Sequence, residues 1–436
     1  MKSSSLPIAI ALFWTLTQAV FADPTPLYYS FTTDAGGGIG RLLADPANGE
    51  IRAHDRVFAD ARARSAKKVF ASASGRFLAL QLEEVEDREN LVVVDLQGEP
   101  RWHDFTGRVD HIEFFGEKLY AGTTAGALHR VDPASGSVEA TWNFRRLLDP
   151  SGRRPENFIF DESTGALWVS FQKDSRGQRH RGSRIVGIDL QSDAVFADLQ
   201  LPRDRPELHY DPEVDGRESG PNPEVLHVSP RNNLLFVTLD LYGSLGMMDL
   251  DAARAGELKN WTTLSTALDQ TMGGAFPDRV GAFDADGREY LLVANASDPG
   301  GAVVLDLKSR QIVQRLSVPG GLTTLKHLPK AGVIASGVSG KIKFRGPEGL
   351  DRRHEPLKTW FLFEIMDGAD GAEPLRVREI QREHYVRRVA PVDAATSPLV
   401  YLNLGENSEI WEVIHPAENE ARARVQAFGT VQRASK

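Results

Sequence analysis

Short apolar runs that end in an acidic residue recur along the whole chain. Six have the same form, RLLAD, LVVVD, LHRVD, IVGID, LGMMD and AVVLD, and they end at Asp45, Asp95, Asp132, Asp189, Asp249 and Asp306. Two weaker copies, WFLFE and IWEVIH, end at Glu364 and His415. The interval of about 50 to 60 residues indicates a repeated structural unit.

Turn-forming residues follow most of these runs, as in PANGE, PASGS and LQSDA. An aspartate at this place can accept a hydrogen bond from the backbone two residues further on, and a nearby Gly or Asn adopts the required backbone angles. We therefore interpret the repeated aspartate as a turn former and not as a functional residue.

Other β-like runs flank each of these segments. One precedes it, as in RFLALQL and ALWVSF, a shorter one closes in a tight turn, as in VLHVSPRNNLLFVTL, and one follows it, as in QIVQRLSV. This gives four short strands per repeat and no long helical periodicity. Four-stranded units repeated around an axis form a β-propeller, so an all-β fold is predicted.

The blades can be counted from the start of each first strand. Seven complete units begin near Lys68, Asp110, Glu156, Glu224, Asp278, Thr323 and Val386. Before them, LYYSFTT, IGRLLAD and EIRAHDRVF supply three strands of an eighth blade, and the tail GTVQRASK supplies its innermost strand. Closing the ring with the N- and C-terminal strands removes exposed edges. We predict eight four-stranded blades, with seven as the alternative if one weak copy is misread.

The first 22 residues contain an early lysine, a short apolar run and a small-residue ending. This pattern predicts a secretory signal peptide over residues 1–22 and a single propeller domain over residues 23–436. The apolar run is shorter than the roughly 20 residues that cross a bilayer. The mature chain is therefore expected to be exported and to have no transmembrane segment.

The chain has no cysteine, which excludes disulfides, an Fe–S cluster, covalently attached c-type haem and a thiol nucleophile. We infer a Gram-negative periplasm, although the acceptor sequences at Asn260 and Asn295 would suit glycosylation in a eukaryotic host. The net charge of −9 is spread along the chain without a basic stripe, so nucleic acid is not an expected partner.

The order of strands and turns in HVSPRNNLLFVTL and ASASGRFLAL resembles the YVTN and quinoprotein amine dehydrogenase-like superfamily of propellers, which includes haem d1-type members. The resemblance covers nearly all of the mature chain and implies periplasmic redox or cofactor-maturation chemistry as one possible function. Its motifs are architectural, and the cysteines and C-x-x-C-H site of characterised members are absent. No catalytic residue transfers position by position.

Long connections are predicted on one face only. The second-to-third connections at residues 172–183 and 339–358 and fourth-to-first connections such as residues 202–223 are long, whereas the other turns are mostly short. Long loops in compact domains are often functional, although they can also merely cover the centre of the ring. The same face receives the first residues of the innermost strands. We predict a central funnel that suits a polar or cationic ligand, or holds water and ion pairs, lined by Lys68, Asp110, His111, Glu156, Glu224, His227, Asp278, Arg387 and Arg388.

Two metal sites are weaker hypotheses. Asp211, Glu213 and Asp215 approximate a calcium loop, but Glu is long for the third position and Asn222 stands where a bidentate Glu belongs. His111, His227 and His327 lie on innermost strands of different blades and could share zinc or a haem iron. The alternatives are a solvated acidic loop and packed strand histidines. Basic clusters within residues 173–181 and 341–358 suit either an anion or ion pairs with neighbouring loops.

Two functions remain. No nucleophile, metal set or cofactor signature stands out, which favours a non-catalytic periplasmic scaffold or accessory protein that binds a protein partner or small ligand on its loop-rich face. The alternative is an enzyme or redox subunit that acts in the funnel, with acid/base candidates Asp110, Glu156, Glu224 and Asp278 and the two histidines His111 and His227.

Overall fold

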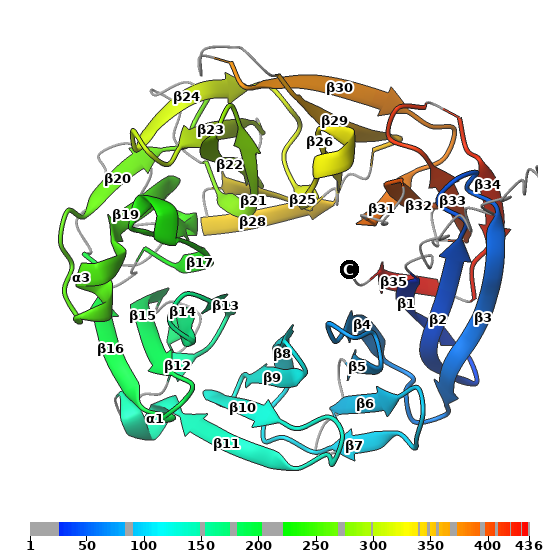
Figure 1. Cartoon of the computed structure of the whole chain (residues 1–436), viewed down its shortest axis with the longest axis horizontal. Helices are drawn as coiled ribbons and strands as arrows, with labels where there is room; N and C mark the ends of the chain where they lie inside the picture. The colour runs from blue at the N-terminus through cyan, green and yellow to red at the C-terminus, as the bar shows by residue number, and fades with distance from the viewer. Residues whose placement is uncertain are drawn as a thin grey trace, which may run out of the picture.

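The computed structural model shows β-sheets arranged as blades around an axis (Figure 1). It describes residues 26–82, 90–148, 153–174, 181–202, 221–268, 275–297, 300–338, 341–346, 349–354, 357–366, 373–392, 397–405, 409–418, 420–428 and 430–434. The predicted signal peptide therefore lies outside the described residues. Eight blades are present, which confirms the eight-bladed fold and excludes the seven-bladed alternative.

The blades are numbered along the chain, and the strands of each blade are given in the order of their labels. Blade 1 contains β1 (Leu27–Thr33), β2 (Gly36–Ala44), β3 (Ile51–Asp60) and β35 (Thr430–Ala434). Blade 2 contains β4 (Ala66–Ala71), β5 (Phe77–Leu82), β6 (Leu91–Asp95) and β7 (Arg101–His103). Blade 3 contains β8 (Val109–Phe115), β9 (Lys118–Thr123), β10 (Ala127–Val131) and β11 (Val138–Asn143). Blade 4 contains β13 (Asn157–Asp161), β14 (Ala166–Asp174), β15 (Arg181–Asp189) and β16 (Val195–Gln200), with β12 (Arg153–Arg154) also paired to β14.

The second half of the ring repeats this order. Blade 5 contains β17 (Pro223–Ser229), β18 (Leu234–Leu239), β19 (Ser244–Asp249) and β20 (Thr262–Ser265). Blade 6 contains β21 (Pro277–Ala285), β22 (Arg288–Asn295), β23 (Ala302–Asp306) and β24 (Gln311–Leu316). Blade 7 contains β25 (Leu322–Leu328), β26 (Val333–Val338), β29 (Thr359–Ile365) and β30 (Leu375–Gln381). Blade 8 contains β31 (Val386–Val392), β32 (Leu399–Leu404), β33 (Ile410–Ile414) and β34 (Ala423–Gln426).

Short helices occur only between strands in the described part of the chain. They are α1 (Phe144–Leu147), α3 (Leu250–Arg254) and the 3-10 turns η1 (Pro230–Asn232), η2 (Asp240–Tyr242) and η3 (Pro329–Ala331). None of these helices is long or apolar enough to cross a bilayer.

The core lies between neighbouring blades. Four of the second strands, β5, β18, β26 and β32, are buried along their whole length, as LLFVTL in β18 and LVYLNL in β32 show. Strands that are covered on both faces are expected to be continuously apolar and not alternating. Large side chains, including Trp168, Trp360 and Trp411, are fully buried in these layers. The packing of blade against blade therefore replaces a single central core.

The repeated aspartates form the turns predicted for them in five of six cases. Asp45 accepts a hydrogen bond from Ala47 N at 2.8 Å, and Asp189 accepts one from Gln191 N at 2.8 Å. The same bond is found at Asp95 and Asp306, and Asp132 accepts from Ser135 N, three residues further on. Asp249 differs, because α3 begins directly after it and its carboxylate instead binds side chains, Asn260 and Arg310.

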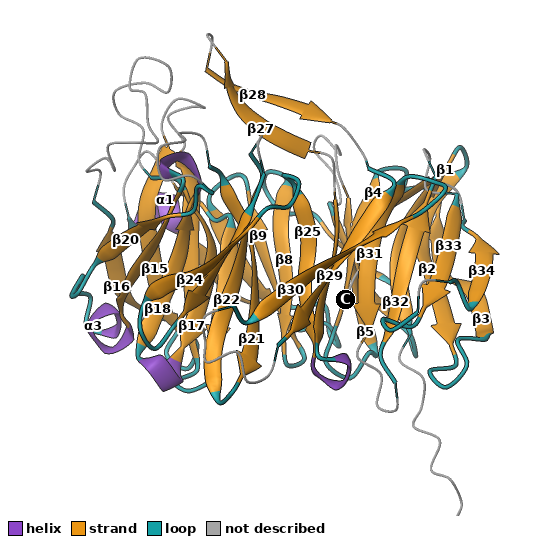
Figure 2. Cartoon of the chain, turned by 90° about the horizontal axis from the view of Figure 1, so that it is seen from above, coloured by secondary structure: helices purple, strands orange, loops and turns teal. Residues whose placement is uncertain are grey.

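Two segments that were expected to be long loops contain strands. β14 continues to Asp174 and β15 begins at Arg181, so residues 172–174 and 181–183 of the segment from 172 to 183 are sheet. The segment after β26 forms a hairpin of β27 (Lys341–Gly346) and β28 (Gly349–His354). Figure 2 shows this hairpin above one face of the ring, while α3 lies near the opposite face. The remaining long connections lie largely outside the described residues.

The last strand belongs to the same sheet as the first. β35 pairs antiparallel with β1, with Phe31 opposite Val431 and Thr32 opposite Thr430. Its position is the innermost one of blade 1, because the order of that sheet is β3-β2-β1-β35.

Candidate ligand site at the axial polar ring

The innermost strands share a register shift near their first residues. A shift separates Ala66 from Lys68 in β4 and Val386 from Arg388 in β31, and equivalent shifts occur in β8, β17, β21 and β25. Such a β-bulge leaves a residue unpaired and changes the direction of the side chains around it. The bulged positions are half-buried and mostly polar, between buried apolar neighbours. We call the following set, with Glu156 just before β13, the axial polar ring: Lys67, Lys68, Asp110, His111, Glu156, Glu224, Asp278, Arg279, Thr323, Thr324, Arg387 and Arg388.

Buried side chains of the preceding blade hold several of these bulges in place. Ser30 Oγ donates to the carbonyl of Lys67 at 3.0 Å, and Ser170 Oγ donates to the carbonyl of Glu224 at 2.7 Å. Gln81 Nε2 donates to Val109 O at 2.7 Å and to Asp110 O at 3.3 Å. All three donors are buried. Hydrogen bonds from the second strand of the preceding blade, which is otherwise apolar, therefore fix the backbone at these bulges.

The acidic half of the ring runs from blade 3 to blade 6. Arg154 from β12 forms an ion pair with Asp110 and lies 3.5 Å from Glu156. Arg108 lies 3.1 Å from the same Asp110 carboxylate, which is only 9% exposed. Burial lowers the pKa of Arg154, and the nearby Glu156 opposes this effect. The first two acids are thus paired with arginines that the sequence prediction did not include.

Arg279 accompanies the other two acids. Its Nη1 donates to the carbonyl of Asp278 and lies 3.7 Å from the Asp278 carboxylate. The charge of Asp278 raises the pKa of Arg279, burial lowers it, and Glu224 and Asp240 raise it further. Although Arg279 lies on an innermost strand, 40% of its side chain is exposed. Solvent and small solutes can therefore reach this guanidinium.

Basic residues dominate the other half of the ring, from blade 7 through blade 1 to blade 2. Arg388 Nη1 donates to the carbonyl of Arg387 at 2.8 Å, and Arg387 Nε donates to Gly405 O at 3.2 Å. Burial, followed by the positive charges of Arg387 and Arg279, lowers the pKa of Arg388 to about 10. Lys67 and Lys68 occupy the equivalent bulge in blade 2.

The three candidate histidines are not brought together. The His111 ring packs edge-on against Phe158 at 4.5 Å, and His327 lies 6.5 Å from Phe283. His227 Nε2 is 3.2 Å from Glu289 of blade 6. Each histidine therefore lies in a different gap between blades, and no group of three metal-ligating side chains occurs among the described residues. The calcium candidates Asp211, Glu213 and Asp215 lie outside the described residues.

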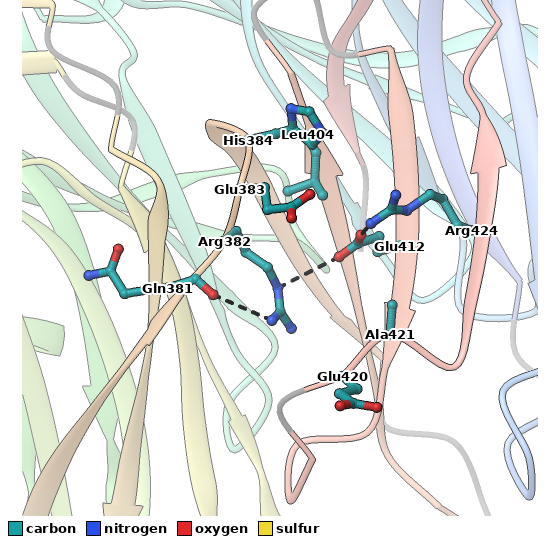
Figure 3. Close-up of a pocket in the computed structure, with 9 residues that line it drawn as sticks. All are labelled: Gln381, Arg382, Glu383, His384, Leu404, Glu412, Glu420, Ala421 and Arg424. Carbon is teal, nitrogen blue, oxygen red and sulfur yellow. Dashed lines mark hydrogen bonds and ion pairs between the residues drawn. The ribbon is translucent and has the colours of Figure 1, made fainter.

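A cavity of about 440 Å³ lies away from the ring, between blades 7 and 8 (Figure 3). Its base contains Glu412, which is 3% exposed, 3.6 Å from Arg382 Nε and ion-paired with Arg424. A buried carboxylate between two arginines is strongly coupled to its partners. We therefore assign this group to the packing of the two blades.

The sequence prediction named one or two residues at five of the six bulges, and it missed Lys67, Arg154, Arg279 and Thr324. A usable signal was present, because KK, DH, DR, TT and RR stand at the same place in five innermost strands. Arg154 carried no such signal, since it belongs to a two-residue strand outside the repeat.

Comparisons with known proteins identify only the fold of this chain. No protein-family model matches the chain, and no curated protein matches it. Dihydro-heme d1 dehydrogenase NirN in complex with DHE is similar over 95% of this chain and 75% of its own, with 12% identity and a TM-score of 0.65. Apo AztD from Citrobacter koseri is similar over 94% and 98%, with 11% identity and a TM-score of 0.54. The periplasmic gluconolactonase PpgL from Pseudomonas aeruginosa is similar over 82% and 96%, with 14% identity and a TM-score of 0.50. At these identities the likeness shows that the chain is a β-propeller, while the superfamily named from the sequence stays a prediction.

Proposed function

We propose that this protein is an exported accessory protein that binds a small polar ligand at the axial polar ring, on its loop-rich face. The observation that carries the proposal is the repeated bulge, which places polar side chains at the same point of successive innermost strands. Buried donors such as Ser30 and Ser170 fix the bulged backbone before any ligand arrives. A site that is positioned in advance loses less free energy to ordering when it binds. Export is proposed from residues 1–22 alone.

The geometry of the bulge does not itself require charged residues. Blade 7 fills the bulge with Thr323 and Thr324, so neutral residues are compatible with this geometry. Neighbouring like charges, as at Arg387 and Arg388, oppose the compact state. Natural proteins retain such locally unfavourable groups chiefly where function requires them.

The proposal is tested by asking what the protein carries when it is purified. Full-length protein is isolated natively from its host, denatured, and the released small molecules are identified by mass spectrometry. The expected result is a stoichiometric polar molecule that is absent from a Glu224→Gln/Asp278→Asn/Arg388→Gln triple variant whose melting temperature is not lowered. Lys308→Gln, at an exposed turn of blade 6, is the matched control. Identical small-molecule profiles from wild type and triple variant would refute the proposal.

An enzyme acting at the same ring is the second candidate. It is favoured by the proximity of two carboxylates to one cation, since both Asp278 and Glu224 raise the pKa of Arg279. A carboxylate within hydrogen-bond reach of a ligand can serve as a general base, and the neighbouring guanidinium can orient that ligand. If the ligand is converted, Glu224→Gln or Asp278→Asn should abolish turnover while leaving ligand binding measurable. Retained turnover in both variants would remove this candidate.

A further inference from the structure

We propose that residues 104–108, which connect blades 2 and 3, form an acid-sensitive latch. A stack of His103, Phe105 and His129 holds the latch closed while both imidazoles are neutral, and it releases the latch when they take up protons. This inference goes beyond the proposed function and does not rest on it, because the opening of the connection is measured without a ligand.

The phenylalanine ring of the connection is stacked on one imidazole from each blade. The centroid of the Phe105 ring lies 5.5 Å from that of His103, the last residue of β7, with 6° between the two planes. It lies 4.2 Å from the centroid of His129 in β10, with 14° between the planes. Phe105 and His103 are each only 8% exposed. The stack therefore joins the outer strand of blade 2 to the third strand of blade 3.

His103 is poorly placed to carry a proton while the latch is closed. Its Nε2 atom is buried and has no hydrogen-bond partner among the described residues. A proton on this atom makes it a charged donor without an acceptor, which is costly to bury. The face of Phe105 attracts an imidazolium, but this attraction is smaller than the loss of hydration at a buried site. Opening of the stack lets water reach Nε2, so protonation favours the open form.

The electrostatics of the two histidines agree with this geometry. Burial, followed by the charge of Arg101 on β7, lowers the pKa of His103. Burial, followed by the charge of His103, lowers the pKa of His129 from 6.5 to about 4. The closed form is therefore fully stabilised above about pH 6.5, where both forms are neutral. As the pH falls from about 6.5 to about 4, the open form binds protons that the closed form does not, and the equilibrium shifts toward opening.

The other polar groups around the stack do not provide a counter-charge for the imidazoles. Asp104, within the connection, is exposed. Glu139 of the neighbouring β11 is paired with Lys118 and with Arg130, the residue after His129. The partner of His129 Nδ1 is the neutral hydroxyl of Thr141, at 3.0 Å. Among the described residues, the charges that act on the two histidines are those of Arg101 and of His103 itself.

The connection also links the stack to the axial polar ring. Asn90 is 4% exposed, and its Nδ2 donates to the carbonyls of Phe105 and Gly107, at 2.7 Å each. Its Oδ1 accepts from the backbone N–H of Phe105 at 3.2 Å. Arg108, the last residue of the connection, lies 3.1 Å from the Asp110 carboxylate of the ring. Displacement of Phe105 breaks its bonds to Asn90, so protonation of the stack changes the position of Arg108.

The test is hydrogen exchange of the full-length protein without ligand, followed by mass spectrometry of peptides that cover residues 104–108. Rates between pH 7 and pH 4 are corrected for the intrinsic effect of pH on exchange. The opening equilibrium should rise about a hundredfold over this range from the lowered pKa of His129 alone. Residues 317–321, which connect blades 6 and 7, contain no histidine and should keep their protection. Unchanged corrected exchange at residues 104–108, or an equal rise in both connections, would overturn the inference.

Substitutions identify the groups that titrate. His103→Gln/His129→Gln has no imidazole in the stack, so exchange at residues 104–108 should no longer depend on pH between 7 and 4. His384→Gln, at an exposed position in the cavity between blades 7 and 8, is the matched control and should keep the wild-type dependence. A dependence that survives in the double variant would assign the opening to another group and contradict the proposal. The comparison of the two connections in wild type does not require this variant to fold.

Discussion

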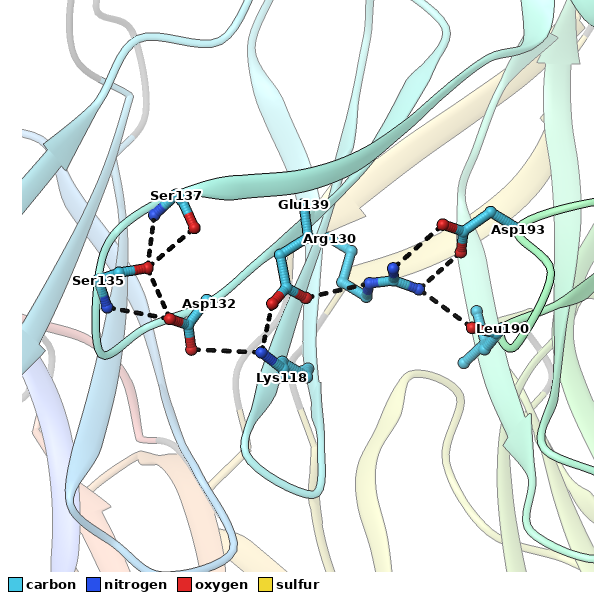
Figure 4. A network of polar contacts seen from close by, with 8 residues as sticks. All are labelled: Lys118, Arg130, Asp132, Ser135, Ser137, Glu139, Leu190 and Asp193. Carbon is cyan, nitrogen blue, oxygen red and sulfur yellow. Dashed lines mark hydrogen bonds and ion pairs between the residues drawn. The ribbon is translucent and has the colours of Figure 1, made fainter.

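The axial polar ring and the outer contacts between blades use the same charged groups in opposite ways. Between blades 3 and 4 the charges alternate in sign (Figure 4): Lys118 lies 2.5 Å from Glu139, Arg130 lies 3.2 Å from Glu139, and Arg130 lies 2.7 Å from Asp193. At the ring, like charges are neighbours in sequence and in space, as Arg387 and Arg388 show. In the outer contacts each charge is paired with one of opposite sign, whereas in this part of the ring two like charges lie side by side.

The outer contacts join successive blades. Asp161 of blade 4 accepts from Arg254 of blade 5 at 2.7 Å, and Asp249 of blade 5 accepts from Arg310 of blade 6 at 2.6 Å. Because such contacts cross from one sheet to the next, they fix the angle between blades. We therefore expect substitutions in the outer contacts to change stability, and substitutions in the ring to change binding.

The largest expected effect is at Asp161. Its side chain is fully buried and accepts bonds from Ser163, Thr164 and Arg254. Asp161→Asn should lower the free energy of unfolding by about 3 kcal/mol, because it leaves Arg254 without its buried partner. The other carboxylate that contacts Arg254 is that of Asp251, whose side chain is 75% exposed. Asp251→Asn should therefore lower the free energy of unfolding by at most about 0.5 kcal/mol. Denaturant unfolding measures both, and similar losses in the two variants would contradict the assignment.

The next largest expected effect is a dependence of stability on pH, which arises at the contact between blades 2 and 3. His129 stacks on Phe105 at 4.2 Å, and burial, followed by the charge of His103, lowers its pKa from 6.5 to about 4. Between these values the unfolded chain binds a proton that the folded protein does not. Stability should therefore fall by about 2 kcal/mol as the pH decreases from about 6.5 to about 4.

The measurement is thermal or urea unfolding across this range with His129→Gln as the comparison. The variant should have a smaller slope of stability against pH. Equal slopes would show that the folded histidine takes up its proton as readily as the unfolded one.

The smallest expected effect is a change in the free energy of unfolding that has opposite signs in the axial polar ring and in the outer contacts. Arg388→Gln removes a cation whose pKa is lowered by burial and by other cations, so it should raise the free energy of unfolding by about 1 kcal/mol. Arg130→Gln removes a cation that is paired with Glu139 and Asp193, and should lower it by about 1 kcal/mol. Melting temperatures of the two variants decide this, and a loss of stability in both would remove the distinction between ring and outer contacts.

The sequence predicted the blades because each strand and turn is encoded locally. The repeated aspartate and the continuous apolar second strands recur with every blade, and the bonds at Asp45 and Asp189 follow directly from that pattern. The site was only partly predictable. Pairing of Arg154 with Asp110 depends on strands that are far apart in the chain, and the hairpin at residues 341–354 was hidden by its many charges. Register shifts, which place Arg279, leave no trace in composition.

The bonds from Ser30, Gln81 and Ser170 make three first strands, β4, β8 and β17, depend on the blade before them. The natural module of this ring is therefore offset from the blade: it comprises the second strand of one blade and the first strand of the next. A blade exchanged between two such proteins at sheet boundaries would separate these partners, and its bulge would lose the donor that shapes it. An exchange cut between first and second strands would keep the pair together.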